Sequence, residues 1–263
     1  MKHGVHIPNF GPFGSARVVA DLAASAEDAG WDGVFIWDHV VRREGDFDVV
    51  DPWVALAAAA GATVRAQLGP LITPLPRRRP WNVAKAAVSL DHLSGGRFVL
   101  GVGLGTSRGP EFPAFGEETD ARRRGDMLDE ALALVRAIWS GEPVTFTGSH
   151  YRVDGARFLP VPSRPGGIPI WAATESVHGR PVRRAATLNG VFPFGIAASD
   201  IPRLVDAVGR ERVEQGSFDV ICVSREDDPE VWAAAGATWW LRELPWGRPL
   251  AETVALVERG PDH

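Results

Sequence analysis

The sequence contains a single cysteine, Cys222, among its 263 residues. One thiol excludes an intrachain disulfide and leaves too few cysteines for a cysteine-rich structural zinc site. Cys222 lies within the apolar run FDVICVS, and free cysteines in such surroundings are mostly buried. We therefore expect an inert, buried thiol rather than a nucleophile.

Long apolar segments and an excess of basic residues are also missing. No apolar run approaches the roughly 18 residues of a membrane-spanning helix. The first ten residues, MKHGVHIPNF, lack the apolar core of a signal peptide. The 28 Lys and Arg residues against 33 Asp and Glu give a net charge of −5, which offers no general attraction to nucleic acid or anionic lipid. The sequence thus predicts a cytoplasmic protein without nucleic-acid or membrane partners.

No Pro- or Ser-rich linker divides the chain, which favours one domain over residues 1–263. Apolar strands with glycine or polar tips alternate with amphipathic helices along its whole length. The expected strands are HGVHIP, VFIW, QLGPLIT, RFVLGVGLG, IPIWAAT, GVFPF, FDVICVS and ATWWLREL. About eight such units, in a length near the roughly 250 residues usual for this fold, predict an α/β protein with a (β/α)8 TIM barrel.

The expected helices follow the strands at about Ser15–Ala29, from Pro52, Trp81–Leu93, Thr119–Ser140, Arg180–Leu188, Ile201–Val213, near Val231 and Leu250–Val257. From Val144, the segment VTFTGSHYRVDGARFLPV alternates like a strand pair, which predicts a hairpin inserted after the fourth β/α unit. An open, doubly wound sheet is the alternative fold. However, GVGLG is followed by a loop with Pro110 and Pro113 instead of the helix that a dinucleotide fingerprint requires.

The second expected strand delivers an acid and an imidazole, Asp38 and His39, at its end. In barrels of alternating strands and helices, reactive groups lie where strands end and loops begin. An imidazole titrates near neutrality and can remove or supply a proton. A loop-capping aspartate beside a neutral, buried histidine is the structural alternative, and we favour the functional interpretation.

Five ordered segments of the sequence, which lie between Asp51 and Gly190, resemble a known family, and the resemblance extends over roughly Gly4 to Pro245. They are DPWVALAAAAGAT, LITPLPRRRPWNVAKAAVSLDHLSGGRFVLGVGLG, EFPAFGE, LVRAIWSGEPVTFTGSHYRV and IPIWAATESVHGRPVRRAATLNG. These segments resemble the luciferase-like monooxygenase family of flavin-dependent oxidoreductases, which includes members that use the deazaflavin coenzyme F-420. The resemblance implies a TIM barrel with an insertion near the hairpin, and F-420 or FMN bound in the barrel mouth.

The resemblance also implies a set of cofactor-binding residues. The ring is expected against a bulge at the end of the third strand, which matches Gly69 to Ile72 and often contains a non-proline cis peptide, here following Pro70. Asp38 is expected to bond to the polar edge of the ring, and His39 to act as the catalytic proton-transfer group. The remaining residues expected around the ring are Pro70, Leu71, Thr73 and Gly103.

The cofactor phosphate is expected, by the same resemblance, on the loop that follows the fifth strand. In this chain the loop contains Ala173, Thr174, Glu175 and Ser176 and lacks the two glycines of the family pattern. Backbone N–H groups at a helix start suit a phosphate, and the hydroxyls of Thr174 and Ser176 are candidate additional donors. Glu175 counts against tight binding, because its carboxylate repels an anion unless it points away.

These observations predict deazaflavin-dependent hydride transfer to or from a small organic substrate by a homodimer, without a bound metal. Asp38 and His39 favour F-420 over FMN. An FMN-dependent monooxygenase fed with reduced flavin and a non-catalytic flavin-fold binding protein are the alternatives. A metal-dependent hydrolase would need more His and Asp residues at strand tips.

Three further sequence features bear on the substrate and on the mouth. Thr106 stands where some deazaflavin-dependent sugar-phosphate dehydrogenases have a glutamate, which disfavours that activity. The connection from Thr106 to Glu118 is expected to cover the mouth, with Phe112 and Phe115 at an apolar substrate edge. The basic run Arg77 to Arg79 is expected to be a solvated loop or an interface.

Overall fold

The computed structural model describes residues 1–42, 46–106, 109–213, 216–225 and 228–261. Its main sheet is parallel throughout and has the strand order β3-β2-β1-β11-β10-β9-β8-β5-β4. The strands are β1 (Lys2–Ile7), β2 (Gly33–Ile36), β3 (Gln67–Pro70), β4 (Thr73–Pro74), β5 (Leu100–Gly103), β8 (Ile170–Thr174), β9 (Gly190–Pro193), β10 (Asp219–Ser224) and β11 (Trp239–Glu243).

The third strand of the barrel is split in two, which is why nine strands form an eight-membered barrel. Between β3 and β4 lie Leu71 and Ile72, which are joined by a non-proline cis peptide bond. β4 pairs with β5, and Leu68 of β3 forms a parallel bridge with Phe98, so the two ends of the sheet meet. The (β/α)8 barrel predicted from the sequence is confirmed, and the cis bond lies within the expected bulge, although it joins Leu71 to Ile72 and does not directly follow Pro70 as expected.

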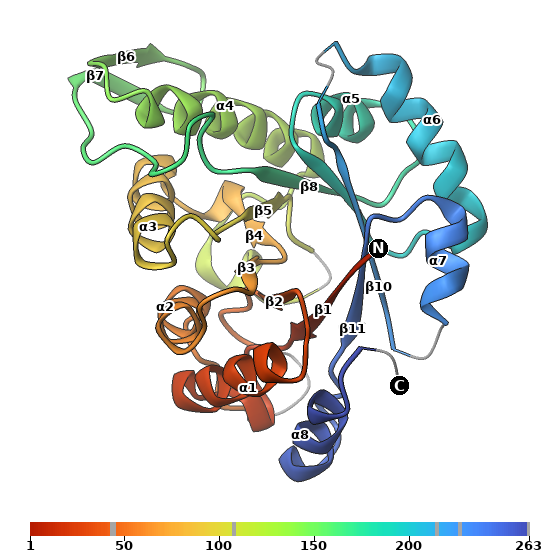
Figure 1. Cartoon of the computed structure of the whole chain (residues 1–263). Helices are drawn as coiled ribbons and strands as arrows, with labels where there is room; N and C mark the ends of the chain where they lie inside the picture. Colours follow the sequence, from red (N-terminus) through yellow and green to blue (C-terminus); the bar gives the residue numbers. More distant parts are fainter. Residues whose placement is uncertain (43–45, 107–108, 214–215, 226–227, 262–263) are drawn as a thin grey trace.

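Helices surround the strands on the outside of the barrel (Figure 1). They are α1 (Ala16–Asp28), α2 (Pro52–Ala62), α3 (Pro80–Leu93), α4 (Ala121–Trp139), α5 (Arg180–Ala186), α6 (Ile201–Glu211), α7 (Pro229–Ala235) and α8 (Leu250–Glu258). Their ends follow from local chemistry: the Asp51 side chain accepts from the first N–H groups of α2, and Asp120 accepts from Arg123 in α4. Among the described residues, no helix combines the length and apolar character required to cross a bilayer.

A separate two-stranded antiparallel sheet lies between α4 and β8 in the chain. It consists of β6 (Val144–Thr147) and β7 (Arg152–Ala156). The carboxylate of Glu130 on α4 holds its turn by accepting from the N–H groups of Ser149 at 2.8 Å and His150 at 2.9 Å. Tyr151 in this turn is buried, and burial raises its pKa to about 12.

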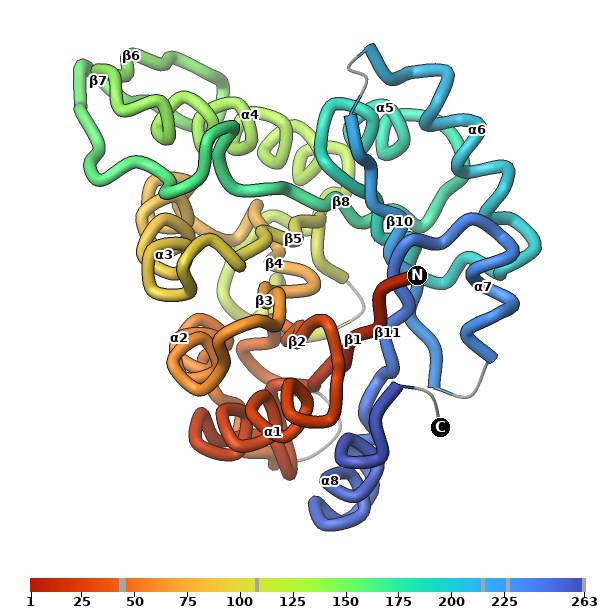
Figure 2. Tube along the Cα trace, viewed as in Figure 1, coloured from red at the N-terminus to blue at the C-terminus, as the bar shows by residue number. Residues whose placement is uncertain are grey.

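Two apolar cores lie on the two faces of the barrel sheet. Inside the barrel, Trp171 and Trp239 pack against each other and against Phe35, with ring centroids 5.2 to 5.8 Å apart. Trp240 points the other way, into the larger core between sheet and helices. Cys222 also belongs to this outer core, and burial raises its pKa to about 12, so the expected buried thiol is confirmed. Figure 2 shows how β1, at the N-terminus, closes against both β2 and β11.

Gly69 allows the split strand to approach β5. A Cβ atom at this position would lie 2.0 Å from the carbonyl oxygen of Val99, a backbone atom that cannot move aside. We expect Gly69→Ala to lower the free energy of unfolding by about 2–3 kcal/mol. Gly61→Ala in α2 is the matched control, because nothing lies within 4 Å of its Cβ and helical alanine is preferred to glycine. Urea unfolding of both variants checks the difference, and equal stabilities would contradict it.

Candidate active site

Asp38 lies at the carboxyl end of β2, where its side chain is fully buried and surrounded by hydrogen-bond donors. Its Oδ1 atom accepts from Arg78 at 2.8 Å and Arg77 at 3.1 Å, and Oδ2 accepts from Thr73 Oγ1 at 2.8 Å. Arg77 also donates to the Asp38 carbonyl oxygen at 2.6 Å. The carboxylate therefore joins the end of β2 to β4 and to the 3-10 turn η2 (Leu75–Arg77) that follows it.

His39 follows directly and is held on its backbone and on both ring nitrogens. Asn9 clamps the backbone, accepting from His39 N at 3.1 Å and donating to its carbonyl oxygen at 2.8 Å. Nδ1 lies 2.9 Å from Glu111 Oε2, and Nε2 lies 3.2 Å from Arg42 Nη1. Arginine only donates, so Nε2 accepts, and the hydrogen of the neutral ring is on Nδ1, directed at Glu111.

Glu111 provides the ionised partner of this imidazole. Burial alone would raise its pKa, but the bonds from His39, the charge of Arg77 and the Val40 N–H group outweigh burial and lower the pKa to about 2. Its Oε1 atom lies 2.6 Å from Val40 N and 3.1 Å from Arg77 Nη1. Arg77 thus contacts both carboxylates of the cluster, Asp38 and Glu111, and fixes their separation.

His6 lies deeper, at the carboxyl end of β1. Its Nε2 atom donates to the Leu71 carbonyl oxygen at 2.9 Å, and its Nδ1 accepts from the Trp37 indole at 3.1 Å. Burial lowers the pKa of His6 to about 4, and the weaker opposing effect is the bond to Leu71. The neutral ring therefore connects the bulge to the residue that precedes Asp38.

The lowered pKa of His6 predicts a stability that depends on pH. The neutral form is favoured in the folded state, so its contribution is complete above the ordinary value of 6.5 and is lost as the pH falls toward about 4. Between pH 7.5 and pH 5 we expect the free energy of unfolding to fall by about 2 kcal/mol. In His6→Gln, whose amide can make both hydrogen bonds, this dependence should vanish. Urea titrations at the two pH values check this prediction. An equal fall in the free energy of unfolding in His6→Gln would contradict it.

The other residues expected around the ring also lie at the carboxyl ends of the strands. Leu71 is buried and belongs to the core inside the barrel, below the charged cluster. Gly103 of β5 leaves room for the bulge, because a Cβ atom there would lie 2.8 Å from Ile72 Cδ1 and 3.3 Å from Ala173 Cβ. Pro70 approaches β5 in the same way, since a Cβ atom at Gly101 would lie 2.2 Å from its carbonyl oxygen.

The loop after β8, the candidate phosphate site, uses its hydroxyl groups internally. Thr174 Oγ1 donates to the Ser176 carbonyl oxygen at 2.7 Å and accepts from Ser176 N. Ser176 Oγ donates to the His178 carbonyl oxygen at 3.1 Å. Both hydroxyl hydrogens are therefore committed within the loop, and Glu175 is exposed to solvent. The backbone N–H groups of Ser176 and His178 are also committed within the loop, to Thr174 Oγ1 and Ser176 Oγ, so this conformation offers few donors to an anion.

The basic run after β4 does not form a solvated loop, and this expectation was wrong for two of its three residues. The side chains of Arg77 and Arg78 are 5% and 24% exposed and both contact Asp38, whereas Arg79 is exposed. Phe112 is also buried, with Arg124 stacked on its ring at 4.5 Å, while Phe115 is 53% exposed. The connection to α4 includes Ser107 and Arg108, which lie outside the described residues.

Sequence reasoning missed Asn9, His6 and Glu111. A weak signal existed for Glu111, because EFPAFGE is one of the segments that carry the family resemblance. No local pattern marks Asn9 or His6, which reach their partners only in the closed barrel. Within the described ranges, no group of three or more His, Cys, Asp or Glu residues is arranged to hold a metal ion.

The closed parallel barrel, with a charged cluster and an oriented imidazole at the carboxyl ends of its strands, defines a TIM-barrel protein with a candidate acid–base site. A family model described as luciferase-like monooxygenase matches residues 2–259. The chain belongs to the luciferase-like monooxygenase family.

Two curated relatives are similar in sequence. An F420-dependent glucose-6-phosphate dehydrogenase from Nakamurella multipartita is 35% identical over 242 residues, which cover 86% of this chain and 69% of the relative. An F420-dependent hydroxymycolic acid dehydrogenase from Mycobacterium tuberculosis is 35% identical over 70% of this chain, and this chain spans about half of that relative, 49%.

Solved structures of the same fold cover nearly the whole chain. An F420-dependent secondary alcohol dehydrogenase in complex with an F420-acetone adduct has a TM-score of 0.82 and 18% identity, covering 99% of this chain and 98% of that one. The monooxygenase RslO1 from Streptomyces bottropensis has a TM-score of 0.79 and 22% identity, covering 98% and 96% of the two chains. At these identities the likeness concerns the fold.

Proposed function

We propose that this protein is a deazaflavin-dependent oxidoreductase that transfers a hydride between coenzyme F-420 and a small organic substrate. The observation that supports this most directly is the His39 imidazole, which Glu111 orients at the barrel mouth. The sequence relatives support the choice of cofactor, because those with 35% identity are F420-dependent dehydrogenases. Thr106, in place of a glutamate, disfavours a sugar phosphate as the substrate.

The described residues fit the ring better than they fit the phosphate. The ring is expected to lie at the bulge of Pro70 and Leu71, above an apolar interior and beside Thr73 and Gly103. Asp38 acts on it through Arg77 and Arg78, because its own oxygens are fully occupied. The phosphate is expected on the loop Ala173 to Ser176, although the hydroxyls of Thr174 and Ser176 and the N–H group of Ser176 are committed within that loop.

The bound deazaflavin would supply the hydride acceptor or donor, and it does not readily activate oxygen. His39 handles the accompanying proton at Nε2, where it accepts a proton from a substrate hydroxyl or returns one to a carbonyl oxygen. Arg42 must leave Nε2 for this step, because its guanidinium occupies that lone pair. Glu111 then stabilises the imidazolium through Nδ1, as an orienting carboxylate does in other acid–base pairs.

Titration of the purified chain with oxidised F-420 and with FMN tests the proposal. We expect quenching of cofactor fluorescence at lower concentrations of F-420 than of FMN, followed by bleaching of the deazaflavin absorbance when a small secondary alcohol is added. Oxygen consumption with reduced FMN and an oxygenated product would instead establish the alternative, an FMN-dependent monooxygenase. Absence of binding by either cofactor would favour a non-catalytic binding protein.

We further propose that the chain forms a homodimer. Helix α2 supports this, because none of its eleven residues is charged and its Val54 side chain is 59% exposed. Sedimentation equilibrium of the wild type and of Val54→Glu tests it, with a monomeric wild type as the contradicting result. A cytoplasmic location and the lack of nucleic-acid partners stay predictions of the sequence.

A further inference from the structure

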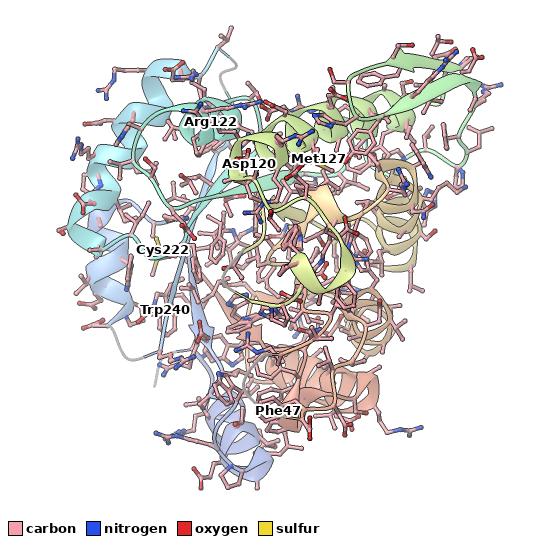
Figure 3. The ribbon with its side chains drawn as sticks, turned by 180° about the vertical axis from the view of Figure 1, so that it is seen from behind. Phe47, Asp120, Arg122, Met127, Cys222 and Trp240 are labelled. Carbon is pink, nitrogen blue, oxygen red and sulfur yellow. The ribbon has the colours of Figure 1, made fainter. Side chains whose placement is uncertain are left out.

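An arginine-rich groove lies on the outer wall of the barrel between α4 and α5. Its cavity measures about 470 Å³, within the range of small-ligand sites. Side chains from both helices line it, including Asp129, Arg136, Arg180, Arg183 and Arg184. The labels Asp120, Arg122 and Met127 in Figure 3 mark the first part of α4, which lies beside α5.

Two of the arginines are held in place by carboxylates of α4. Arg180 Nη1 lies 2.6 Å from Asp126 Oδ1, and its Nη2 lies 2.7 Å from Asp129 Oδ2. Arg184 pairs with the other oxygen of Asp129, and its side chain is only 6% exposed. The guanidinium groups are therefore fixed before any ligand arrives, which reduces the entropy lost on binding.

Gly125 of α4 lies beside both guanidinium groups. A Cβ atom at this position would lie 3.4 Å from Arg180 Nη1 and 3.7 Å from Arg184 Nη2. These are ordinary contact distances, and Arg184 Nη2 also donates to the Gly125 carbonyl oxygen at 3.4 Å, which ties its guanidinium group to α4.

The groove keeps a positive charge after its internal pairs are counted. Four arginines face two carboxylates, those of Asp126 and Asp129. Arg136 donates to the Thr187 carbonyl oxygen, which leaves its charge uncompensated, and the exposed Arg183 side chain has no partner among the described residues. Guanidinium groups in such a cluster bind carboxylates and phosphates with paired hydrogen bonds.

The groove begins where the proposed phosphate loop ends. That loop leaves β8 at Thr174, and Arg180 follows its last residue, Gly179, directly in the chain. From Arg180 the lining residues continue along α5 and beyond its end to Leu188. An anionic chain that extends from a phosphate on this loop would therefore meet the arginines without crossing the barrel mouth.

We propose that this groove binds the anionic tail of the deazaflavin cofactor. F-420 ends in a chain of carboxylates linked through its phosphate, whereas FMN ends at the phosphate. The groove would therefore take up the part of F-420 that FMN lacks and contribute to the choice between the two cofactors. This inference rests on the proposed function and names a second binding site for the same cofactor.

Fluorescence titrations with three ligands test it: intact F-420, its tail-free deazaflavin riboside, and free oligo-γ-glutamate as a competitor. Arg183→Glu reverses a charge that stabilises no part of the fold. We expect this variant to bind intact F-420 with roughly tenfold lower affinity and to bind the riboside with the affinity of the wild type. Arg17→Glu on α1, an exposed arginine with the same change of charge, is the matched control and should alter neither affinity.

The outcomes separate the two proposals. If Arg183→Glu changed the affinities for intact F-420 and for the riboside equally, the tail site would be overturned and the proposed function would stay intact. Oligo-γ-glutamate that binds the wild type and not the variant, with unchanged cofactor affinities, would assign the groove to an independent polyanion and also overturn the tail site. Absence of binding by both F-420 and the riboside would overturn the proposed function itself.

Discussion

Replacing His39 by alanine is expected to lower turnover roughly 100-fold or more while leaving cofactor affinity nearly unchanged, the range typical of losing a general acid–base group. The imidazole is oriented through Nδ1 by Glu111, and its Nε2 lies 3.2 Å from Arg42 Nη1. Steady-state turnover and cofactor titration, measured on the same preparation, check the prediction. Unchanged turnover would remove His39 from the mechanism.

Two further variants distinguish chemistry from structure. His92→Ala is the matched control, since this exposed histidine on α3 has its side-chain hydrogen bond with the Val161 carbonyl oxygen, and its turnover should equal that of the wild type. Glu111→Gln keeps the shape of the side chain but removes the charge that stabilises the imidazolium. We expect about a tenfold loss of turnover and a shift of the pH–rate profile to lower pH. A purely structural role for Glu111 would leave the profile in place.

Asp38→Asn is expected to have the largest effect on stability, lowering the free energy of unfolding by about 3 kcal/mol or more. The carboxylate is fully buried and accepts from Arg77, Arg78 and Thr73. Asparagine preserves the volume but leaves two guanidinium groups, 5% and 24% exposed, without this counter-ion. Arg77 keeps Glu111 as a partner, whereas Arg78 loses its carboxylate, and removing the partner of a buried charge costs more than the net contribution of the intact pair.

Urea unfolding at pH 7.5 measures this effect. Asp21→Asn on α1 is the matched control, because this exposed carboxylate has no partner among the described residues and its loss should change stability by less than about 0.5 kcal/mol. Asp38→Asn that is as stable as the control would show that Arg77 and Arg78 gain other partners or water. The cluster would then not be the joint between β2 and β4 that its contacts indicate.

Much of the barrel could be predicted from the sequence. Strands buried on both faces must be continuously apolar, so runs such as VFIW and FDVICVS mark them without knowledge of their neighbours. Helix ends carry local signals, such as Asp51 before Pro52, and these were found within a few residues of the observed ends. The bulge between Gly69 and Ile72 came from the family resemblance, and its cis bond lies one peptide bond later than expected, between Leu71 and Ile72.

The charged cluster at the mouth could be predicted only in part. Asp38 and His39 follow a strand, and their place at the mouth is a consequence of that strand's direction. Their partners are distant in the chain: Arg78 lies 40 residues from Asp38, and Glu111 lies 72 residues from His39. A basic run has the same local pattern whether it is solvated or buried against a carboxylate, which is why Arg77 and Arg78 were misassigned.

The sequence by itself determined the alternation of strands and helices, the family, and the two residues that β2 presents at its end. Those properties depend on short-range periodicity and on the conformations that single residues allow. Only the tertiary structure decided which charges are paired, which ring nitrogen of His39 carries the hydrogen, and where four arginines gather between α4 and α5. Electrostatic pairing depends on distances through space, and these are set only when the barrel closes.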